Sequence, residues 1–236
     1  MKIVTWNCNG AFRKKHHFLD KFDADLLIIQ ECENPSQSTS EYRKWAKNHF
    51  WIGGNKHKGL GVFALKGQSL QKLSWESKSL QLFLPVRVND AFNLVAVWTK
   101  KAGSKHFGYI GQFWKYLQLH KDRIKSEKSL VCGDFNSNAI WHDHECWWNH
   151  LDVVRELKEV GLESLYHQYF GEEQGQESRP TLYLHRKIDR PYHIDYAFVS
   201  RKLIIDYDYF VEVGRHDEWL QYSDHMPVVF SINGVS

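Results

Sequence analysis

The sequence predicts an α/β fold in which two mixed β-sheets pack face to face and helices lie outside. Short runs of β-branched and aromatic residues, bounded by Gly, Asn, Asp or Pro, recur along the chain and predict strands. These runs outnumber the helix-like segments and are mixed with them without strict alternation, which favours two packed sheets. No linker or repeat divides the 236 residues, so we expect a single domain, residues 1–236.

Each element is predicted from its local pattern. Helix periodicity, with apolar residues three and four positions apart, covers residues 11–22, 109–125 and 150–161, and the last of these ends at a glycine. The strand pattern covers residues 2–6, 26–30, 60–65, 80–88, 92–98, 130–132, 193–200, 205–213 and 227–232.

The composition is that of an ordinary globular protein, with 42% hydrophobic and 25% charged residues. A net charge of +3 permits a polyanionic partner but does not require one. The four cysteines show no CxxC pair and no disulfide-framework spacing, so we expect free thiols. No signal peptide or apolar span is visible, and we therefore expect a cytoplasmic protein that does not bind membranes.

The stretch "SLVCGDFNSN", residues 129–138, carries a strand-like run directly into an acid and an amide, Asp134 and Asn136. Gly, Asp and Asn are common turn formers, so a simple turn is one interpretation. The other is a ligand site at the end of a sheet. The two interpretations are distinguished by whether other predicted strands also end in polar side chains.

Four further segments also place polar side chains at or within strands. Asn7 and Asn9 follow the first strand, and Glu31 follows the second. Near the C-terminus, one strand-like run contains Asp195. A second strand-like run is immediately preceded by Asp224 and His225. Repetition in segments so far apart favours convergence on one site over a set of unrelated turns or strand caps.

The chemistry of these side chains is coherent. Glu31 and Asp224, with amide oxygens nearby, offer the hard oxygen ligands that suit Mg²⁺ or Mn²⁺. An imidazole such as His225 paired with Asp195 becomes a cation that neutralises charge on a phosphoryl oxygen. Asp134 is then placed to activate a water for attack on phosphorus. This inventory predicts metal-assisted hydrolysis of a phosphate ester.

The motifs "TWNCNG", "IIQE", "GDFN", "HIDY" and "SDHMPV" occur in this order between residues 5 and 228. Together they resemble the motifs of the endonuclease/exonuclease/phosphatase superfamily, most closely those of exonuclease III and the AP endonucleases. The resemblance implies a four-layer, DNase I-like α/β sandwich and Mg²⁺-dependent phosphodiester hydrolysis. It makes Glu31 the principal metal ligand, with Asn7, Asn9 and Asp224 nearby. It makes Asp134 the residue that activates water, Asn136 its partner, and Asp195 with His225 the pair that stabilises the phosphate; we count Asn7 with these catalytic residues.

Three positions depart from the motifs of these relatives. His193 stands where the family's "RIDY" has Arg, and Trp98 stands where AP endonucleases carry a catalytic Tyr. Trp has no acidic hydroxyl, so Trp98 is expected to pack or stack. Asn9 replaces an Asp found in some relatives and makes the metal site one formal charge weaker.

The resemblance also implies a pocket for a displaced nucleotide, formed by residues of two late segments. We assign Trp98, Tyr183, Tyr192 and His193 to substrate binding, while Leu182 and Ile194 fit ordinary core packing equally well. Basic clusters at 13–15, 56–58 and 100–105 are consistent either with solubility or with phosphate contacts.

A separate zinc hypothesis arises from "WHDHECWWNH", residues 141–150, which carries His142, His144, Cys146 and His150. Their spacing matches no common zinc pattern, so we favour a loop at the rim of the cleft.

The preferred function is that of a DNA nuclease with Mg²⁺ or Mn²⁺, acting as a monomer on nucleic acid. The alternatives are a phosphatase or phosphodiesterase for inositol phosphates, phospholipid head groups or RNA, and a catalytically silent nucleic-acid-binding module. The complete set of acids and imidazole argues against the silent module.

Overall fold

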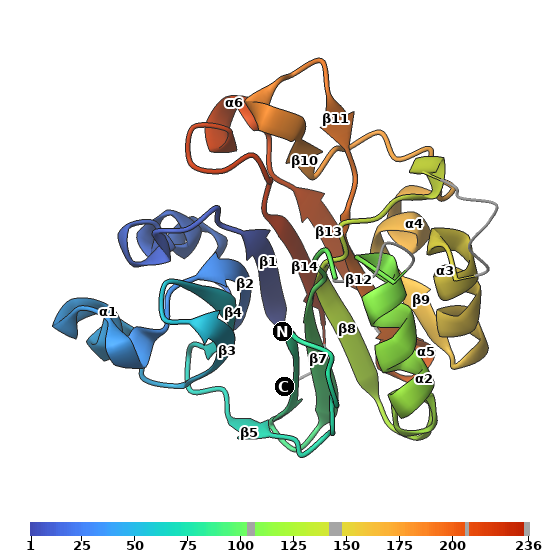
Figure 1. Cartoon of the computed structure of the whole chain (residues 1–236), viewed down its shortest axis with the longest axis horizontal. Helices are drawn as coiled ribbons and strands as arrows, with labels where there is room; N and C mark the ends of the chain where they lie inside the picture. The colour runs from blue at the N-terminus through green and yellow to red at the C-terminus, as the bar shows by residue number, and fades with distance from the viewer. Residues whose placement is uncertain (103–106, 142–147, 206–207, 234–236) are drawn as a thin grey trace.

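Two six-stranded sheets form the centre of the molecule (Figure 1). The computed structural model describes residues 1–102, 107–141, 148–205 and 208–233. In the first sheet the order is β13-β14-β1-β2-β4-β3, and β1 pairs in parallel with β2 and antiparallel with β14. Its strands are β1 (Lys2–Asn7), β2 (Leu26–Cys32), β3 (His49–Asn55), β4 (Lys58–Ala64), β13 (Tyr209–Val213) and β14 (Val228–Ile232).

The second sheet has the order β5-β6-β7-β8-β12-β9, with β7 and β8 parallel and β8 and β12 antiparallel. A separate two-stranded hairpin, β10 (Leu182–Tyr183) and β11 (Pro191–Tyr192), lies at the top of the view in Figure 1. The strands of the second sheet are β5 (Leu70–Lys72), β6 (Phe83–Val88), β7 (Phe92–Trp98), β8 (Ser129–Asp134), β9 (Leu162–Ser164) and β12 (Asp195–Ser200).

Helices cover the outer faces of both sheets. The α-helices are α1 (Ser40–Trp45), α2 (Ile110–Ser126), α3 (His150–Glu159), α4 (Leu165–Phe170), α5 (Arg201–Ile204) and α6 (His216–Trp219). The 3₁₀ helices are η1 (Phe12–Lys14), η2 (His16–Phe22), η3 (Pro35–Gln37), η4 (Ala139–Trp141) and η5 (Leu184–Arg186). Among the described helices, none has the length and apolarity that a membrane crossing requires.

Three apolar clusters hold these layers together. One lies between the sheets and joins, for example, Ile28 and Phe230 of the first sheet to Leu94 of the second. The second packs η1, η2, α1 and α6 on the outer face of the first sheet, and the third packs α2 and α3 on the second sheet. The result is the predicted four-layer sandwich, and burial of these apolar side chains is its main stabilising term.

Each predicted strand segment contains an observed strand, and the differences lie at the ends. The segment 205–213 begins its strand only at Tyr209, and residues 206–207 lie outside the described part of the chain. The predicted helix 11–22 is wrong in type, because it forms two 3₁₀ helices separated at Lys15, whose φ of −121° is not helical. Short elements such as β5, β9 and α4 escape prediction, since three to six residues carry little periodicity.

Gly133 precedes Asp134 at the end of β8 and allows β8 to pack closely against β7. Its φ is +146°, a conformation that L side chains rarely adopt, and a Cβ built there would lie 2.0 Å from the Val97 carbonyl oxygen of β7. Only glycine permits this close approach of the two parallel strands. The glycine in "GDFN" is therefore a packing requirement beside the acid.

Gly133→Ala is expected to lower the free energy of unfolding by about 1–3 kcal/mol or more, because the methyl group forces β7 and β8 apart. Gly54→Ala is the matched control, since a Cβ added there would have nothing within 4 Å and the φ of Gly54 is not in the left-handed region. Urea denaturation measures both. Equal stability of the two variants would contradict this explanation for Gly133.

Candidate active site

A row of three side chains crosses the end of the second sheet. Trp98 of β7 is the register partner of Asp134 of β8, and Asp134 is the register partner of Asp195 of β12. Neighbouring strands lie about 4.8 Å apart, so the register alone places the two carboxylates side by side. Asp134 is 0% and Asp195 1% exposed. The charged forms of two buried acids this close are disfavoured unless a cation compensates them.

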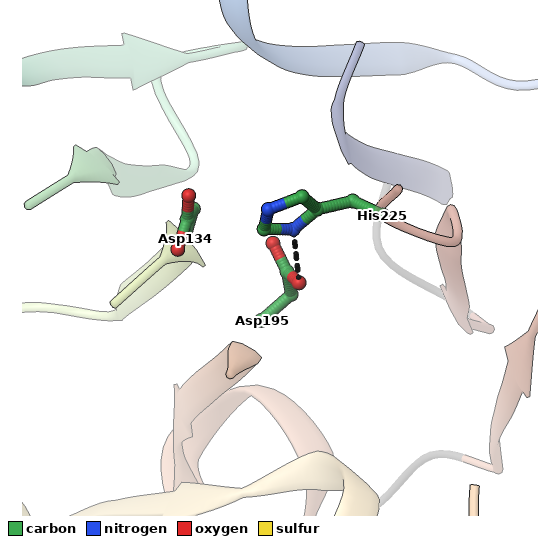
Figure 2. Close-up of side chains that lie close together, drawn as sticks. All are labelled: Asp134, Asp195 and His225. Carbon is green, nitrogen blue, oxygen red and sulfur yellow. Dashed lines mark hydrogen bonds and ion pairs between the residues drawn. The ribbon is translucent and has the colours of Figure 1, made fainter. Parts of the chain in front are cut away.

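That cation comes from the first sheet. His225 lies just before β14, and its Nδ1 is 2.9 Å from Oδ2 of Asp195. Its backbone is fixed at both ends, because its N–H donates to Ser223 Oγ at 3.0 Å and its carbonyl accepts from Trp6 Nε1 at 2.9 Å. Figure 2 shows the imidazole ring above Asp195, with the ring edge that carries the second nitrogen, Nε2, facing Asp134. Ligand atoms of all three residues lie within 4.8 Å of one another.

Asp134 is held by donors from both neighbouring segments. Asn7 Nδ2, at the end of β1, donates to Oδ2 at 3.0 Å, and the backbone N–H of Asn136 donates to Oδ1 at 2.9 Å. The Asn136 side chain turns away and donates to the Thr99 carbonyl at 3.1 Å. Asn136 therefore orients Asp134 through its backbone, while its amide ties the turn to β7.

The pKa values in this cluster follow from burial and from the neighbouring charges. Burial raises the pKa of Asp134 to about 7, although the His225 imidazolium opposes this and Asp195 adds to it. Burial alone would lower the pKa of His225, but the carboxylates of Asp195 and Asp134 outweigh it and raise the pKa to about 10. His225 is thus a cation at neutral pH, and Asp134 titrates near neutrality, as a general base requires.

Further polar side chains lie near the ends of β1 and β2 and before β14. Asn9 Nδ2 donates to Asp224 Oδ1 at 3.2 Å, and Glu31 follows Gln30, the register partner of Asn7. The carboxylate of Glu31 pairs with Lys58 of β4 at 2.5 Å. Asn7 connects Asn9 to the buried cluster, because its Oδ1 accepts the Asn9 N–H at 3.1 Å while its Nδ2 holds Asp134.

Glu31, Asp224 and Asn9 are better suited to a divalent metal than the buried cluster. Glu31 and Asp224 are carboxylates at partly exposed positions beside the Asn9 amide, and hard oxygens of this kind suit Mg²⁺ or Mn²⁺. In the buried cluster, His225 is protonated and its Nδ1 hydrogen is used by Asp195, so the ring offers a hydrogen bond and no lone pair. The oxygens of Glu31, Asp224 and Asn9 therefore have the donor chemistry that a divalent metal requires, which the ring of His225 lacks.

The residues predicted to bind substrate lie in different surroundings. Tyr192 is partly exposed, and its ring centroid lies 4.9 Å from that of Trp141. Tyr183 is 8% exposed, with its hydroxyl 3.5 Å from His216 Nδ1, and Trp98 is 3% exposed. His193 is 3% exposed, and its Nδ1 is bound to the Arg179 carbonyl at 2.8 Å. This contact holds the His193 ring against the backbone of Arg179.

Sequence reasoning missed residues that support the site. Thr181 Oγ1 accepts the N–H groups of Ile194 and Asp195 at 2.9 and 3.1 Å and so fixes the start of β12. Trp141, 47% exposed beside Tyr192, lies in a stretch for which the sequence predicts only a rim loop. The aromatic character of "WHDHECWW" is the available signal for Trp141. A threonine carries no comparable signal.

The zinc hypothesis concerns residues that are largely outside the described chain, since His142, His144 and Cys146 fall in residues 142–147. His150 is described, and its ring nitrogens are 3.1 Å from Ser137 Oγ and 3.0 Å from Gln174 Oε1. Both nitrogens therefore have protein partners. Burial lowers the pKa of His150 to about 4.

The free energy of unfolding of metal-free Asp134→Asn, relative to that of wild type, is expected to rise as the pH increases from 4 to 7.5. The pKa of Asp134 is raised in the folded state from 3.8 to about 7, so its contribution to stability is full below pH 3.8 and is lost as the pH rises through 7. The variant lacks this loss, so the difference in free energy of unfolding between the variant and wild type should increase in favour of the variant as the pH rises.

Urea denaturation with chelator present, repeated across this pH range, measures the effect. Asp122→Asn changes an exposed acid of α2 and serves as the control. Parallel stability curves for wild type and Asp134→Asn would contradict the raised pKa.

The comparisons with known proteins agree with this geometry. Residues 4–225 match the model of the Endonuclease/Exonuclease/phosphatase family. The fold is similar to a 3'-5' exonuclease from Neisseria meningitidis, with a TM-score of 0.76 and 19% identity over 98% of this chain and 99% of that one. A search of curated proteins finds no match.

Two further solved structures share the fold. A 3' phosphatase from Neisseria, bound to a product DNA hairpin, gives a TM-score of 0.71 at 17% identity over 99% of both chains. An AP endonuclease from Archaeoglobus fulgidus gives a TM-score of 0.70 at 18% identity over 99% of both chains. With the family match across nearly the whole sequence, the chain belongs to the endonuclease/exonuclease/phosphatase family of phosphoester hydrolases.

Proposed function

We propose that this protein is a divalent-metal-dependent nuclease that hydrolyses phosphodiester bonds of DNA. The observation that carries the proposal is the buried trio at the end of the second sheet. Asp134 has a pKa near 7 and lies beside the imidazolium of His225, which Asp195 holds through Nδ1. A base and a cation fixed within 4.8 Å of each other match the needs of water attack on a phosphate.

In the proposed reaction, the Asp134 carboxylate accepts a proton from the attacking water while the oxygen–phosphorus bond forms. His225 donates a hydrogen bond from Nε2 to a nonbridging phosphoryl oxygen and neutralises the charge that develops there. The bond to the leaving oxygen breaks in line with the attack. Asn7 and the Asn136 backbone keep Asp134 oriented, because both donate to its carboxylate.

A metal ion held by Glu31, Asp224 and Asn9 would supply Lewis-acid stabilisation of the phosphate and of the leaving oxygen. Lys58 pairs with Glu31, so a metal at this carboxylate would share it with the ammonium group or displace that group. We infer Mg²⁺ or Mn²⁺ because the candidate ligands are oxygens.

DNA is the proposed substrate class. Its support is the similarity in fold to a 3'-5' exonuclease, to a 3' phosphatase bound to a DNA hairpin and to an AP endonuclease. The exposed ring of Trp141 beside Tyr192 also suits a nucleotide base, since every base can stack on an aromatic face. One chain supplies every residue of the proposed site, so we propose that the enzyme acts as a monomer.

Asp134→Asn is expected to reduce hydrolysis at least about 10³-fold while DNA affinity stays the same or rises, because the amide cannot accept the proton and one negative charge is removed. Single-turnover cleavage of labelled DNA and anisotropy of the same DNA measure the two properties. Asp122→Asn is the matched control and should retain full activity. An Asp134→Asn enzyme with an undiminished rate would contradict the role of Asp134.

The substrate class is tested with labelled abasic duplex, intact duplex, duplex with a 3' phosphate, single-stranded DNA, RNA and inositol phosphates. Each is incubated with Mg²⁺ and with chelator. The proposal requires cleavage of at least one DNA substrate and loss of that cleavage in chelator. Cleavage of inositol phosphates alone would favour the small-molecule phosphatase, and activity retained in chelator would contradict the metal.

A further inference from the structure

A separate polar cavity lies beside the end of β7. Its volume is about 290 Å³, and the polar side chains that line it are Ser79, Gln81, Gln112, Lys100 and Lys101. We propose that this cavity, called here the lysine pocket, binds a backbone phosphate of the nucleic acid near the one that is cut. The inference rests on the proposed function and adds a second phosphate-binding position to it.

The position of the pocket is fixed relative to Asp134. Trp98 is the register partner of Asp134, and Lys100 follows two residues later. Thr99 lies between them. Its N–H donates to the Asp134 carbonyl at 3.0 Å, and its carbonyl accepts a hydrogen bond from Asn136 Nδ2 at 3.1 Å. Its hydroxyl also donates to the Phe135 carbonyl at 2.5 Å. A polymer whose phosphate reaches Asp134 therefore passes close to Lys100.

The lining has the chemistry of an anion site. All of its polar side chains can donate hydrogen bonds, and two of them are cations. Of the lining residues that the structure describes, none is acidic. Within the described ranges, neither Lys100 nor Lys101 forms an ion pair with a carboxylate. Two cations without compensating acids favour a negatively charged ligand.

Trp98 places one of these cations. Its ring centroid lies 4.6 Å from Nζ of Lys100, within the range of a cation–π interaction. The backbone of Lys100 is held as well, because its carbonyl accepts the Tyr109 N–H at 2.8 Å. Since Trp98 is buried, it acts as a positioning residue for Lys100, which differs from the direct substrate contact expected from the sequence.

The same lining distinguishes a phosphate from a base. None of the described lining residues is aromatic, so the pocket offers no ring on which a base could stack. Lysine ammonium groups contact phosphates as point charges and carry no sequence information. The pocket therefore contributes affinity along the strand and no base preference.

The salt dependence of DNA binding tests the pocket directly. Binding of a fluorescein-labelled DNA duplex is measured by anisotropy over a series of salt concentrations, in protein that carries Asp134→Asn to prevent cleavage. Loss of one phosphate contact lowers the magnitude of the slope of log affinity against log salt by about 0.9. We expect this decrease when Lys100→Gln and Lys101→Gln are combined, because the two lysines share one phosphate, and part of it for Lys100→Gln alone. Lys100→Arg keeps the original slope.

Lys125→Gln is the matched control, because Lys125 is an exposed lysine near the end of α2, just before the opposite end of β8. It should leave the slope unchanged. A slope unaffected by Lys100→Gln and Lys101→Gln, or lowered equally by Lys125→Gln, would overturn the pocket. Lowered slopes together with no DNA hydrolysis by wild type would support the pocket and refute the proposed nuclease.

Discussion

The candidate active site depends on the contact between two buried acids of the second sheet, Asp134 and Asp195, and the imidazolium of His225 from the first sheet. The pairing of β8 with β12 places Asp134 directly opposite Asp195, and both are shielded from water. Without a cation, the charged forms of the two acids would be strongly disfavoured. His225 supplies that cation from the segment before β14, so the electrostatic balance of the second sheet depends on correct docking of the first.

Several polar residues around this contact are hydrogen-bonded to one another. Asn7 bridges the sheets by holding Asp134 with one end of its amide and Asn9 with the other. Ser223 joins the two segments that bring Asn7 and His225 together, because its hydroxyl donates to the Asn7 carbonyl at 2.7 Å and accepts the His225 N–H. A site preorganised in this way needs little rearrangement when a phosphate arrives, which is the condition for strong electrostatic stabilisation.

Much of the fold could be predicted from the sequence because each long strand carries its own apolar run between turn residues. The grouping of Asp134, Asp195 and His225 followed from the repeated polar strand ends and from the motif resemblance. What could not be predicted depends on three-dimensional packing. The 3₁₀ form of residues 12–22, the enclosure of His193 and the cation over Trp98 arise from contacts between distant segments, and local patterns do not record these.

The central claim is most directly tested by the protonation state of His225 in the metal-free protein. Nitrogen-15 NMR of the imidazole ring, assigned with a His225→Asn variant, reports whether one or both ring nitrogens carry hydrogen as the pH changes. Because Asp195 and Asp134 outweigh the effect of burial and raise the pKa of His225 to about 10, both nitrogens should be protonated at pH 7.5, with deprotonation only near pH 10. A ring that loses its proton near pH 6.5, as an isolated histidine does, would contradict the account.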